Sequence, residues 1–345
     1  MRFLGGLLAF ILISDVFASE IVKVRLFTTS QSQIKIFENL FLTNTFVASA
    51  IKEPMEIKGR NLSVNANSVP DHVILHPRKD KSGGNGSIEV IAVLDMEDYL
   101  RGVLPHEMPL VWPLEALKAQ AVVARSFTKK QMVARKDNPY HLDSTVNDQM
   151  YRYNHVFSAK EKENLEKALE ETKDEILTDA NGSAVKAVYH ADCGGQTEKA
   201  SQVWGQKEVE FSVKDSKCPS NPYSNWEYTI SPEELKTKLK TPFIPKTLTV
   251  SKESLSERAQ QMEVSGLSGR ERLSSQEFRR LVGYSKLKST KFQVQKINEG
   301  FLFKGSGFGH GVGLCQWGAR SWAKSGLAYK EILKHYFPSY SLVKQ

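Results

Sequence analysis

The strongest helical pattern in the chain starts immediately after Pro113. Apolar residues recur there every three or four positions, so they lie along one face of a helix. They are Leu114, Leu117, Ala121, Ala124 and Phe127. The pattern stops at Asn138-Pro139, because a proline disfavours helical backbone at the residue before it. The sequence therefore predicts one long helix with a single apolar stripe, from Leu114 to about Lys136.

Predicted strands and further predicted helices surround this helix in the sequence. Residues 21–27, 46–51, 73–75, 88–94 and 184–191 are apolar or β-branched runs bounded by polar residues, which predicts strands. Shorter helices are expected over residues 96–103 and near the end of the chain. Another runs from Ser158, which forms a capping box with Glu161, to about Leu177. The predicted fold class is therefore α+β, with mixed strands and several helices.

The same patterns divide the chain into unequal parts. Residues 19–87 are expected to form a β-rich N-terminal region, and residues 88–345 a larger domain. Within that domain residues 206–290 are polar and rich in lysine. We expect an insertion or subdomain there, with helices beginning at Pro232 and near Gln276.

The N-terminus has the pattern of a secretory signal peptide. Arg2 precedes an uncharged apolar run, and Val16-Phe17-Ala18 supplies small residues at the two positions that a signal peptidase reads. We expect residues 1–18 to be removed. A membrane anchor is the alternative, but the apolar run is short for spanning a bilayer. The mature protein is therefore expected in the periplasm or cell-wall space, without stable membrane insertion.

The charge of the chain limits the classes of partner that it is expected to bind. Its formal net charge is +8, and the basic residues are scattered rather than gathered in a dense block. This distribution and the predicted export disfavour nucleic acid as a partner. An exported basic protein is better matched to an acidic wall polymer or to anionic headgroups.

The chain has three cysteines, Cys193, Cys218 and Cys315, and no CxxC pair, so a structural zinc knuckle has no support. In an oxidising compartment Cys193 and Cys218 are expected to form a disulfide. Cys315 lies among apolar residues and glycines and is expected to be a buried free thiol. A cysteine nucleophile is a poor alternative, because no cysteine lies in a recognisable activating motif.

Glu107 is the first candidate for chemistry. It stands between Pro105 and Pro109, with His106 and Met108 beside it. A carboxyl group in such a rigid, partly apolar turn can have its pKa raised toward neutrality, as a general acid requires. From these residues alone, a solvated loop glutamate without a role remains open. The glycine alternation over residues 305–313 is a second feature; it fails the dinucleotide-loop spacing and lets backbone approach backbone or ligand closely.

A set of longer motifs resembles the SpoIID/LytB family of exported peptidoglycan lytic transglycosylases and amidase enhancers. The resemblance covers roughly residues 88–345 and is weakest in the insertion. The motifs, in chain order, are LDMEDYLRGV (94–103), EMP (107–109), LEALKAQAVVAR (114–125), DQMY (148–151), YHADCGGQT (189–197), VWG (203–205), GFGHGVGLCQWGA (307–319) and HYFP (335–338).

This resemblance implies that Glu107 is the catalytic acid/base. The expected activity is lytic transglycosylation of the MurNAc-GlcNAc bond in peptidoglycan glycan strands, with peptide-free strands preferred and 1,6-anhydroMurNAc ends as product. Hydrolytic glycosidases usually need two carboxylates. A transglycosylase can use the C6 hydroxyl of the sugar itself, so one group serves first as acid and then as base.

The fold is expected to form an extended substrate groove. By resemblance or by their place on the long helix, several residues are expected to bind substrate: Lys118, Gln120, Arg125, Gln149, Tyr151, Gly194, His310 and Gln316. For Lys118, Gln120 and Arg125 a solvated helix face is an equal alternative. His310 is nearly as well explained as a core histidine, and it is given no proton-transfer role.

One departure from the family concerns metal. Some members have two zinc-binding cysteines before the Gln-x-Tyr motif, and the corresponding residues here are Ser144 and Asp148, with only His141 nearby as a plausible ligand. The thiolates of a closed zinc site are therefore missing at that place. We expect no metal and no cofactor.

Two other function classes remain open. A non-catalytic protein that binds the wall and enhances an N-acetylmuramoyl-L-alanine amidase would have that amidase as its partner. A structural wall-binding protein would bind glycan with Glu107 dispensable. The presence of Glu107 favours the enzyme.

Overall fold

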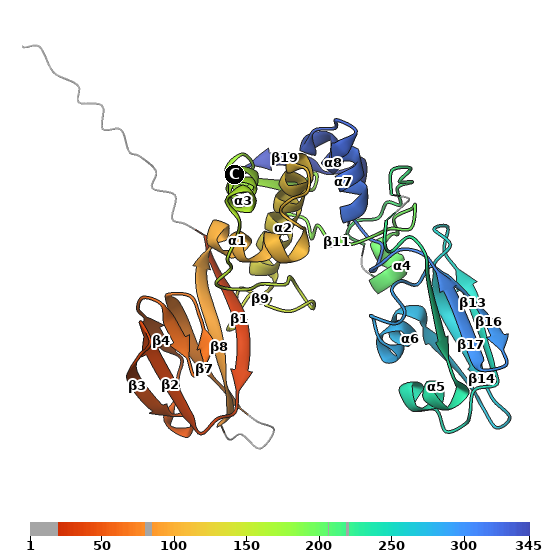
Figure 1. Cartoon of the computed structure of the whole chain (residues 1–345), viewed down its shortest axis with the longest axis horizontal. Coiled ribbons are helices and arrows are strands. Elements are labelled where there is room, and N and C mark those ends of the chain that lie inside the picture. The colour runs from red at the N-terminus through yellow and green to blue at the C-terminus, as the bar shows by residue number, and fades with distance from the viewer. Residues whose placement is uncertain (1–19, 80–84, 206, 219–220) are drawn as a thin grey trace, which may run out of the picture.

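The computed structural model describes residues 20–79, 85–205, 207–218 and 221–345. The predicted signal peptide lies outside these residues. Across the described segments the chain forms eight α-helices and nineteen strands, which confirms the predicted α+β class. Figure 1 shows a helical region with sheet-rich parts on either side of it. No described helix is long and apolar enough to cross a membrane.

Two sheets form the N-terminal region. One has the order β4-β7-β8-β1-β9 and the other β3-β2-β5-β6. The strands are β1 (Ile21–Thr29), β2 (Gln33–Glu38), β3 (Phe41–Val47), β4 (Met55–Lys58), β5 (Leu62–Val64), β6 (Asn67–Ser68), β7 (His72–Lys79), β8 (Asn85–Asp95) and β9 (Leu142–Asp143). Their buried side chains include Ile34, Val64 and Val90, which belong to one apolar cluster.

The long strands β1 and β8 connect this region to the helices. They pair antiparallel from Ile21 opposite Asp95 to Thr29 opposite Ile88. Asp95 then caps the next helix, because its side chain accepts the N–H of Asp98. The first helix therefore starts directly at the end of β8, the middle strand of this sheet.

Helices build the central region. They are α1 (Met96–Glu107), α2 (Leu114–Ala134), α3 (Ala159–Glu170), α4 (Ala200–Trp204), α7 (Gln316–Lys324) and α8 (Tyr329–Tyr336). Two short pairs of strands complete the region: β10 (Glu175–Thr178) with β19 (Ser341–Lys344), and β11 (Tyr189–His190) with β18 (Leu314–Cys315). The apolar stripe of α2 lies in the core, with Leu117 and Ala121 wholly buried.

Two helices differ from the sequence prediction. Helix α1 continues past Val103 to Glu107 and contains Pro105. Helix α3 has the predicted capping box at Ser158 but ends at Glu170, because Leu177 belongs to strand β10 instead. An apolar run alone does not distinguish the end of a helix from a strand that follows it.

The segment between α4 and α7 holds a second core. Its elements are β12 (Trp226–Ile230), α5 (Pro232–Leu239), β13 (Thr247–Glu253), β14 (Ala259–Ser265), β15 (Arg270–Ser274), α6 (Ser275–Val282), β16 (Phe292–Ile297) and β17 (Gly300–Gly305). They form the sheets β12-β17-β16 and β13-β14-β15 around buried residues such as Phe278 and Phe303. This cluster overlaps the residues of the expected insertion and extends beyond residue 290, while the domain boundaries stay a prediction.

Candidate active site

Glu107 is the last residue of α1 and is half-buried. Its Oε1 accepts the backbone N–H of Met150 at 2.8 Å, which fixes the orientation of the carboxyl group. Burial raises the pKa of Glu107 above its ordinary value, and the hydrogen bond from Met150 opposes that shift. A fraction of the side chain therefore stays protonated at a pH where an exposed glutamate has lost its proton.

The hydroxyl of Tyr189 faces the same carboxyl group. It lies close enough to lower the pKa of Glu107, yet within the described structure it is buried without a hydrogen bond of normal geometry. The backbone of Tyr189 is held from the other side, where Nε2 of His310 lies 2.8 Å from its carbonyl oxygen. Tyr189 is thus placed to exchange a hydrogen bond with Glu107 or with a ligand that reaches it.

Gln316 supports Glu107 from the start of α7. Its side-chain amide donates to the backbone carbonyl of Glu107 at 2.9 Å and lies 3.4 Å from Oε1 of Gln120. The amide nitrogen of Gln120 is buried and has no partner in the described part of the chain. The structure therefore brings Glu107, Gln120 and Gln316 together, while their roles toward substrate stay predictions.

Other carboxyl groups near Glu107 in sequence have separate partners. Asp98 pairs with Arg101 at 2.6 Å in the first turn of α1. Glu115 contacts Lys118 at 2.6 Å and accepts the N–H of Tyr329 at 2.8 Å. Among the described residues, no carboxylate contributes to the pKa shift of Glu107.

Gln149 and Tyr151 flank Met150 in sequence, and their side chains are buried rather than exposed at a surface. Gln149 is 0% exposed, and its Oε1 accepts hydrogen bonds from Tyr99 at 3.0 Å and Thr128 at 2.9 Å. The ring of Tyr151 stacks on that of Tyr99 with centroids 5.6 Å apart. These contacts position the backbone around Met150, while direct binding of substrate by either residue stays a prediction.

Arg125 and Lys118 make ion pairs inside the protein. Arg125 is 1% exposed, and its guanidinium contacts the carboxylate of Glu97 at 2.9 and 3.0 Å. Lys118 contacts Glu115 and Glu171, each at 2.6 Å. Both cations have partners that explain their positions, so their role toward substrate also stays a prediction.

His310 is a neutral residue with both ring nitrogens engaged. Nδ1 accepts the N–H of Val312 at 3.0 Å, and Nε2 donates to Tyr189 as described above. Burial lowers the pKa of His310 well below its ordinary value. Its contacts hold strand β11 beside the glycine-rich segment and give it no visible part in proton transfer.

Half-buried aromatic rings continue from Gln316. Trp317 lies 4.8 Å from Trp112 and 6.5 Å from Tyr223, measured between ring centroids. The guanidinium of Arg320 sits 5.4 Å from the ring centre of Trp112 and 4.9 Å from that of Trp317. Rings of this kind offer apolar faces beside polar groups, as amphipathic ligands such as sugars require.

Two open hollows among the described residues are relevant to substrate binding. The larger one measures about 840 Å³, includes Gly194, Cys218, Asn221 and Ser306 in its lining, and does not reach Glu107. The other measures about 670 Å³ and lies along the second core, beside Trp226 and Phe292. Gly194 is therefore in a hollow of its own, and a continuous groove from Gly194 to Glu107 stays a prediction.

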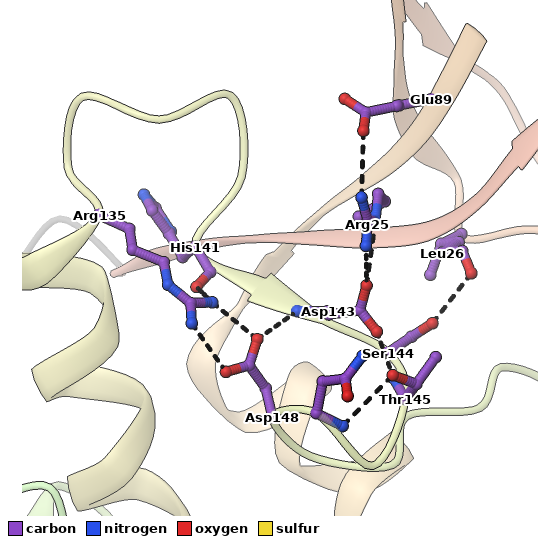
Figure 2. A network of polar contacts seen from close by, with 10 residues as sticks. Arg25, Leu26, Glu89, Arg135, His141, Asp143, Ser144, Thr145 and Asp148 are labelled. Carbon is purple, nitrogen blue, oxygen red and sulfur yellow. Dashed lines mark hydrogen bonds and ion pairs between the residues drawn. The ribbon is translucent and has the colours of Figure 1, made fainter. Parts of the chain in front are cut away.

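Some family members have zinc-binding cysteines at the positions of Ser144 and Asp148. In this chain these positions belong to a network of ion pairs and hydrogen bonds, shown in Figure 2. Arg135 contacts both carboxylate oxygens of Asp148, at 2.7 and 3.0 Å, and the N–H of Asp143 donates to Asp148 at 2.8 Å. Arg25 bridges Asp143 and Glu89 on the other side. The negative charge of Asp148 is thus balanced by the guanidinium group of Arg135.

The other two candidates at this place are also hydrogen-bonded. The hydroxyl of Ser144 donates to the carbonyl of Leu26 at 2.9 Å, and Nδ1 of His141 accepts the N–H of Lys23 at 3.1 Å. None of these contacts tests for metal directly. The absence of a metal at this place remains a prediction.

The cysteine prediction needs correction. Cys193, Cys218 and Cys315 are all free and buried, so the expected disulfide between Cys193 and Cys218 is not formed in the structure. The physical reason is that Cys315, expected to stand alone, joins the other two: its sulfur lies 3.3 Å from that of Cys218. The sulfurs therefore form a group of three rather than a pair and a single thiol.

Sequence reasoning missed Tyr189 and the N–H of Met150 as parts of the site. Tyr189 was visible as the first residue of the YHADCGGQT motif, but nothing in its spacing indicated that the chain would bring it to Glu107. A backbone N–H leaves no signal in the residue type at all. Both contacts depend on tertiary structure.

Comparisons with known proteins point to one family. A family model described as "Stage II sporulation protein" matches residues 84–178, and a domain of unknown function (DUF8618) matches residues 152–313. An uncharacterized protein of Brachyspira hyodysenteriae is 33% identical over 266 residues, which is 75% of this chain and 69% of the relative.

Two named relatives come from Bacillus. The stage II sporulation protein D of Bacillus amyloliquefaciens is 31% identical over 265 residues, covering 73% of this chain and 74% of the relative. The amidase enhancer of Bacillus subtilis is 29% identical over 299 residues, covering 70% of this chain but only 40% of that longer protein.

Proposed function

The chain belongs to the stage II sporulation protein D family, and from this premise we propose that it is a peptidoglycan lytic transglycosylase with Glu107 as its acid/base. A role at the cell wall agrees with the names of its relatives. The proposed substrate is the MurNAc-GlcNAc bond of glycan strands without stem peptides. The proposed site of action is the periplasm or cell-wall space.

The observation that carries this proposal is the half-buried carboxyl group of Glu107, whose raised pKa is shaped by no other carboxylate among the described residues. In the first step the protonated carboxyl group donates its proton to the glycosidic oxygen as the bond to C1 of MurNAc breaks. In the second step the carboxylate takes the proton of the C6 hydroxyl, and O6 bonds to C1. The ring closes as 1,6-anhydroMurNAc, no water is consumed, and Glu107 regains its proton.

Neighbouring groups favour this sequence of steps. The N–H of Met150 and the amide of Gln316 hold the carboxyl oxygen and the backbone of Glu107, so the side chain keeps one orientation. Tyr189 supplies a hydroxyl beside the reacting carboxyl group. The C6 hydroxyl belongs to the sugar that is being cleaved, so the enzyme does not have to capture a second molecule.

Binding of the strand is assigned to the aromatic and basic surface that continues from Gln316. Trp112 and Trp317 present ring faces to sugar carbons, and Arg320 brings a cation suited to the lactyl carboxylate. The chain's net charge of +8 favours approach to an acidic polymer.

The second candidate is an enhancer that binds the wall and stimulates an amidase without cutting glycan. The name of the Bacillus subtilis relative favours it. The test is to incubate the purified protein with peptide-free glycan strands, and separately with intact sacculi plus a wall amidase. Soluble glycan fragments from the first incubation support the transglycosylase. Faster amidase action with no glycan fragments supports the enhancer instead.

A further inference from the structure

Four potential metal ligands meet at one buried point away from Glu107. They are the sulfurs of Cys193, Cys218 and Cys315 and a carboxylate oxygen of Asp215, all within 4.8 Å of one another. Cys193 follows β11, Asp215 and Cys218 lie in the loop after α4, and Cys315 ends β18. The fold thus gathers them from three separate stretches of chain.

The distances suit a shared ion. A disulfide has an S–S bond of about 2.05 Å. Two thiolates on one tetrahedral zinc ion, each about 2.3 Å from it, lie about 3.8 Å apart. The sulfurs of Cys218 and Cys315 are 3.3 Å apart, and that of Cys193 is 3.6 Å from Oδ2 of Asp215. These are non-bonded separations, close to those around a tetrahedral ion.

A buried carboxylate among thiols also needs a cation. Asp215 and the three cysteines are all buried. If the four groups ionised with no cation between them, up to four anionic side chains would meet, which is unfavourable in a low-dielectric interior. A divalent metal would remove most of that repulsion.

Outer contacts orient the ligands. The sulfur of Cys315 accepts the N–H groups of Gly318 and Cys193, each at 3.3 Å, and it caps the N-terminus of α7. Asp215 accepts the indole N–H of Trp322 at 3.2 Å and the hydroxyl of Tyr336. Donors of this kind orient metal ligands in proteins and are a second requirement of a metal site.

Arg258 supplies compensating charge from the second core. Its guanidinium is wholly buried and donates to the carbonyl of Cys193 at 2.7 Å, while its Nε and Nη1 have no partner in the described residues. Zinc with three thiolates and one carboxylate carries a net negative charge. A nearby cation without a carboxylate partner of its own lowers the cost of burying that charge.

We propose that Cys193, Cys218, Cys315 and Asp215 bind one structural zinc ion. Three sulfur ligands select a soft, tetrahedral metal, and four protein ligands leave no position for a catalytic water. Cys218 also lines the larger hollow, which gives the ion a way in. The proposal replaces both our expectation of no metal and our expectation of a disulfide, and it does not depend on the proposed function.

The ion would stabilise the support of the candidate active site. Cys315 is adjacent to Gln316, which contacts Glu107, and strand β18 pairs with β11, which carries Tyr189. Binding of zinc therefore joins the start of α7, the strand pair and the loop after α4. Its main effect should be on stability, with activity following from it.

The test uses the full chain purified without chelator. Metal analysis should find one zinc ion per chain, and thiol titration in denaturant with chelator should find three free thiols. Replacement by cobalt should give the intense visible bands of tetrahedral, thiolate-bound cobalt. Chelator alone should lower the melting temperature, and added zinc should restore it.

Variants distinguish this place from the family's usual zinc position. Asp215→Asn should weaken zinc binding at least about tenfold, measured by competition with a chromophoric chelator. His141→Ala is the matched control and should keep the wild-type affinity. Three results overturn the proposal: wild-type protein without zinc, a single free thiol in the titration, or zinc that is lost in His141→Ala and kept in Asp215→Asn. The first two use only wild-type protein, so a variant that fails to fold does not leave the question open.

Discussion

The side-chain amide of Gln316 donates to the backbone carbonyl of Glu107 at 2.9 Å, which joins residues 209 positions apart in the chain. The preceding residue, Cys315, belongs to the sulfur cluster. One turn of chain at the start of α7 therefore contacts both the backbone of the candidate catalytic residue and the proposed metal site. This arrangement explains how a motif near the end of the chain can support chemistry on α1.

Tyr189→Phe tests whether the hydroxyl acts on Glu107. That hydroxyl lowers the pKa of Glu107, so its removal should raise that pKa further and shift the alkaline limb of the pH–rate profile upward. The profile of glycan cleavage measures this directly. Tyr228→Phe, which removes a hydroxyl that contacts Glu234 in the second core, should leave the limb in place. An unchanged limb in Tyr189→Phe would show that the hydroxyl does not reach the carboxyl group.

Arg125→Met tests the buried ion pair against the binding role expected from the sequence. The change leaves Glu97 without its partner and should lower the free energy of unfolding by about 3–5 kcal/mol. The control, Arg101→Met, breaks more exposed pairs and should lose about 1 kcal/mol or less. Urea unfolding measures both. If Arg125→Met keeps wild-type stability and raises only KM, the side chain binds substrate.

Gly313→Ala tests the close approach of β18 and β11. Gly313 has a φ of 73°, and an added Cβ would collide with the carbonyl oxygen of Val188. This clash should cost more than the roughly 1 kcal/mol expected from the strained backbone alone. Gly326→Ala has a φ of 95° with nothing within 4 Å of the new Cβ, so it reports the backbone strain alone. Equal melting temperatures for the two variants would contradict the close packing at Gly313.

Glu107→Gln should change the pH dependence of stability. Burial raises the folded-state pKa of Glu107 above 4.5, so the protonated form stabilises the fold below that value and this contribution is lost as the pH rises through the folded pKa. The uncharged variant lacks this loss, so its stability relative to wild type should rise as the pH increases above the ordinary glutamate value of 4.5. Glu163→Gln is the control with the opposite sign, because hydrogen bonds to Lys167 and Lys160 lower the pKa of Glu163. Denaturant midpoints across this range measure both trends, and parallel curves for wild type and Glu107→Gln would refute a raised pKa.

Local patterns predicted much of the fold. The apolar stripe of α2, the capping box of α3 and the strand-like runs at residues 21–27 and 73–75 appear as elements of the expected kind. The run at residues 46–51, predicted as a strand, instead contains a short 3-10 helix over Ala48–Ala50. These features depend on neighbours in sequence, so the sequence carries them directly. Helix ends were less accurate, since Pro105 lies inside α1 and Leu177 belongs to a strand.

The parts that were missed depend on contacts between distant segments. Spacing alone does not determine how three widely separated cysteines associate, and a lone aspartate in a polar stretch, such as Asp215, has no distinguishing pattern. Arg125 looked like an edge residue of the helix, but its partner, Glu97, comes from another helix. Pairings of this kind follow from the packing of α1, α2 and the strands, which local periodicity does not determine.

The central claim is that Glu107 cleaves glycan strands without an activated water. The most direct measurement is mass spectrometry of fragments released from peptide-free strands by wild-type protein and by Glu107→Gln. The account predicts 1,6-anhydroMurNAc ends from the wild type, lighter by one water than hydrolytic ends, and at least about a hundredfold slower release by the variant. Reducing MurNAc ends, or equal release by Glu107→Gln, would contradict it.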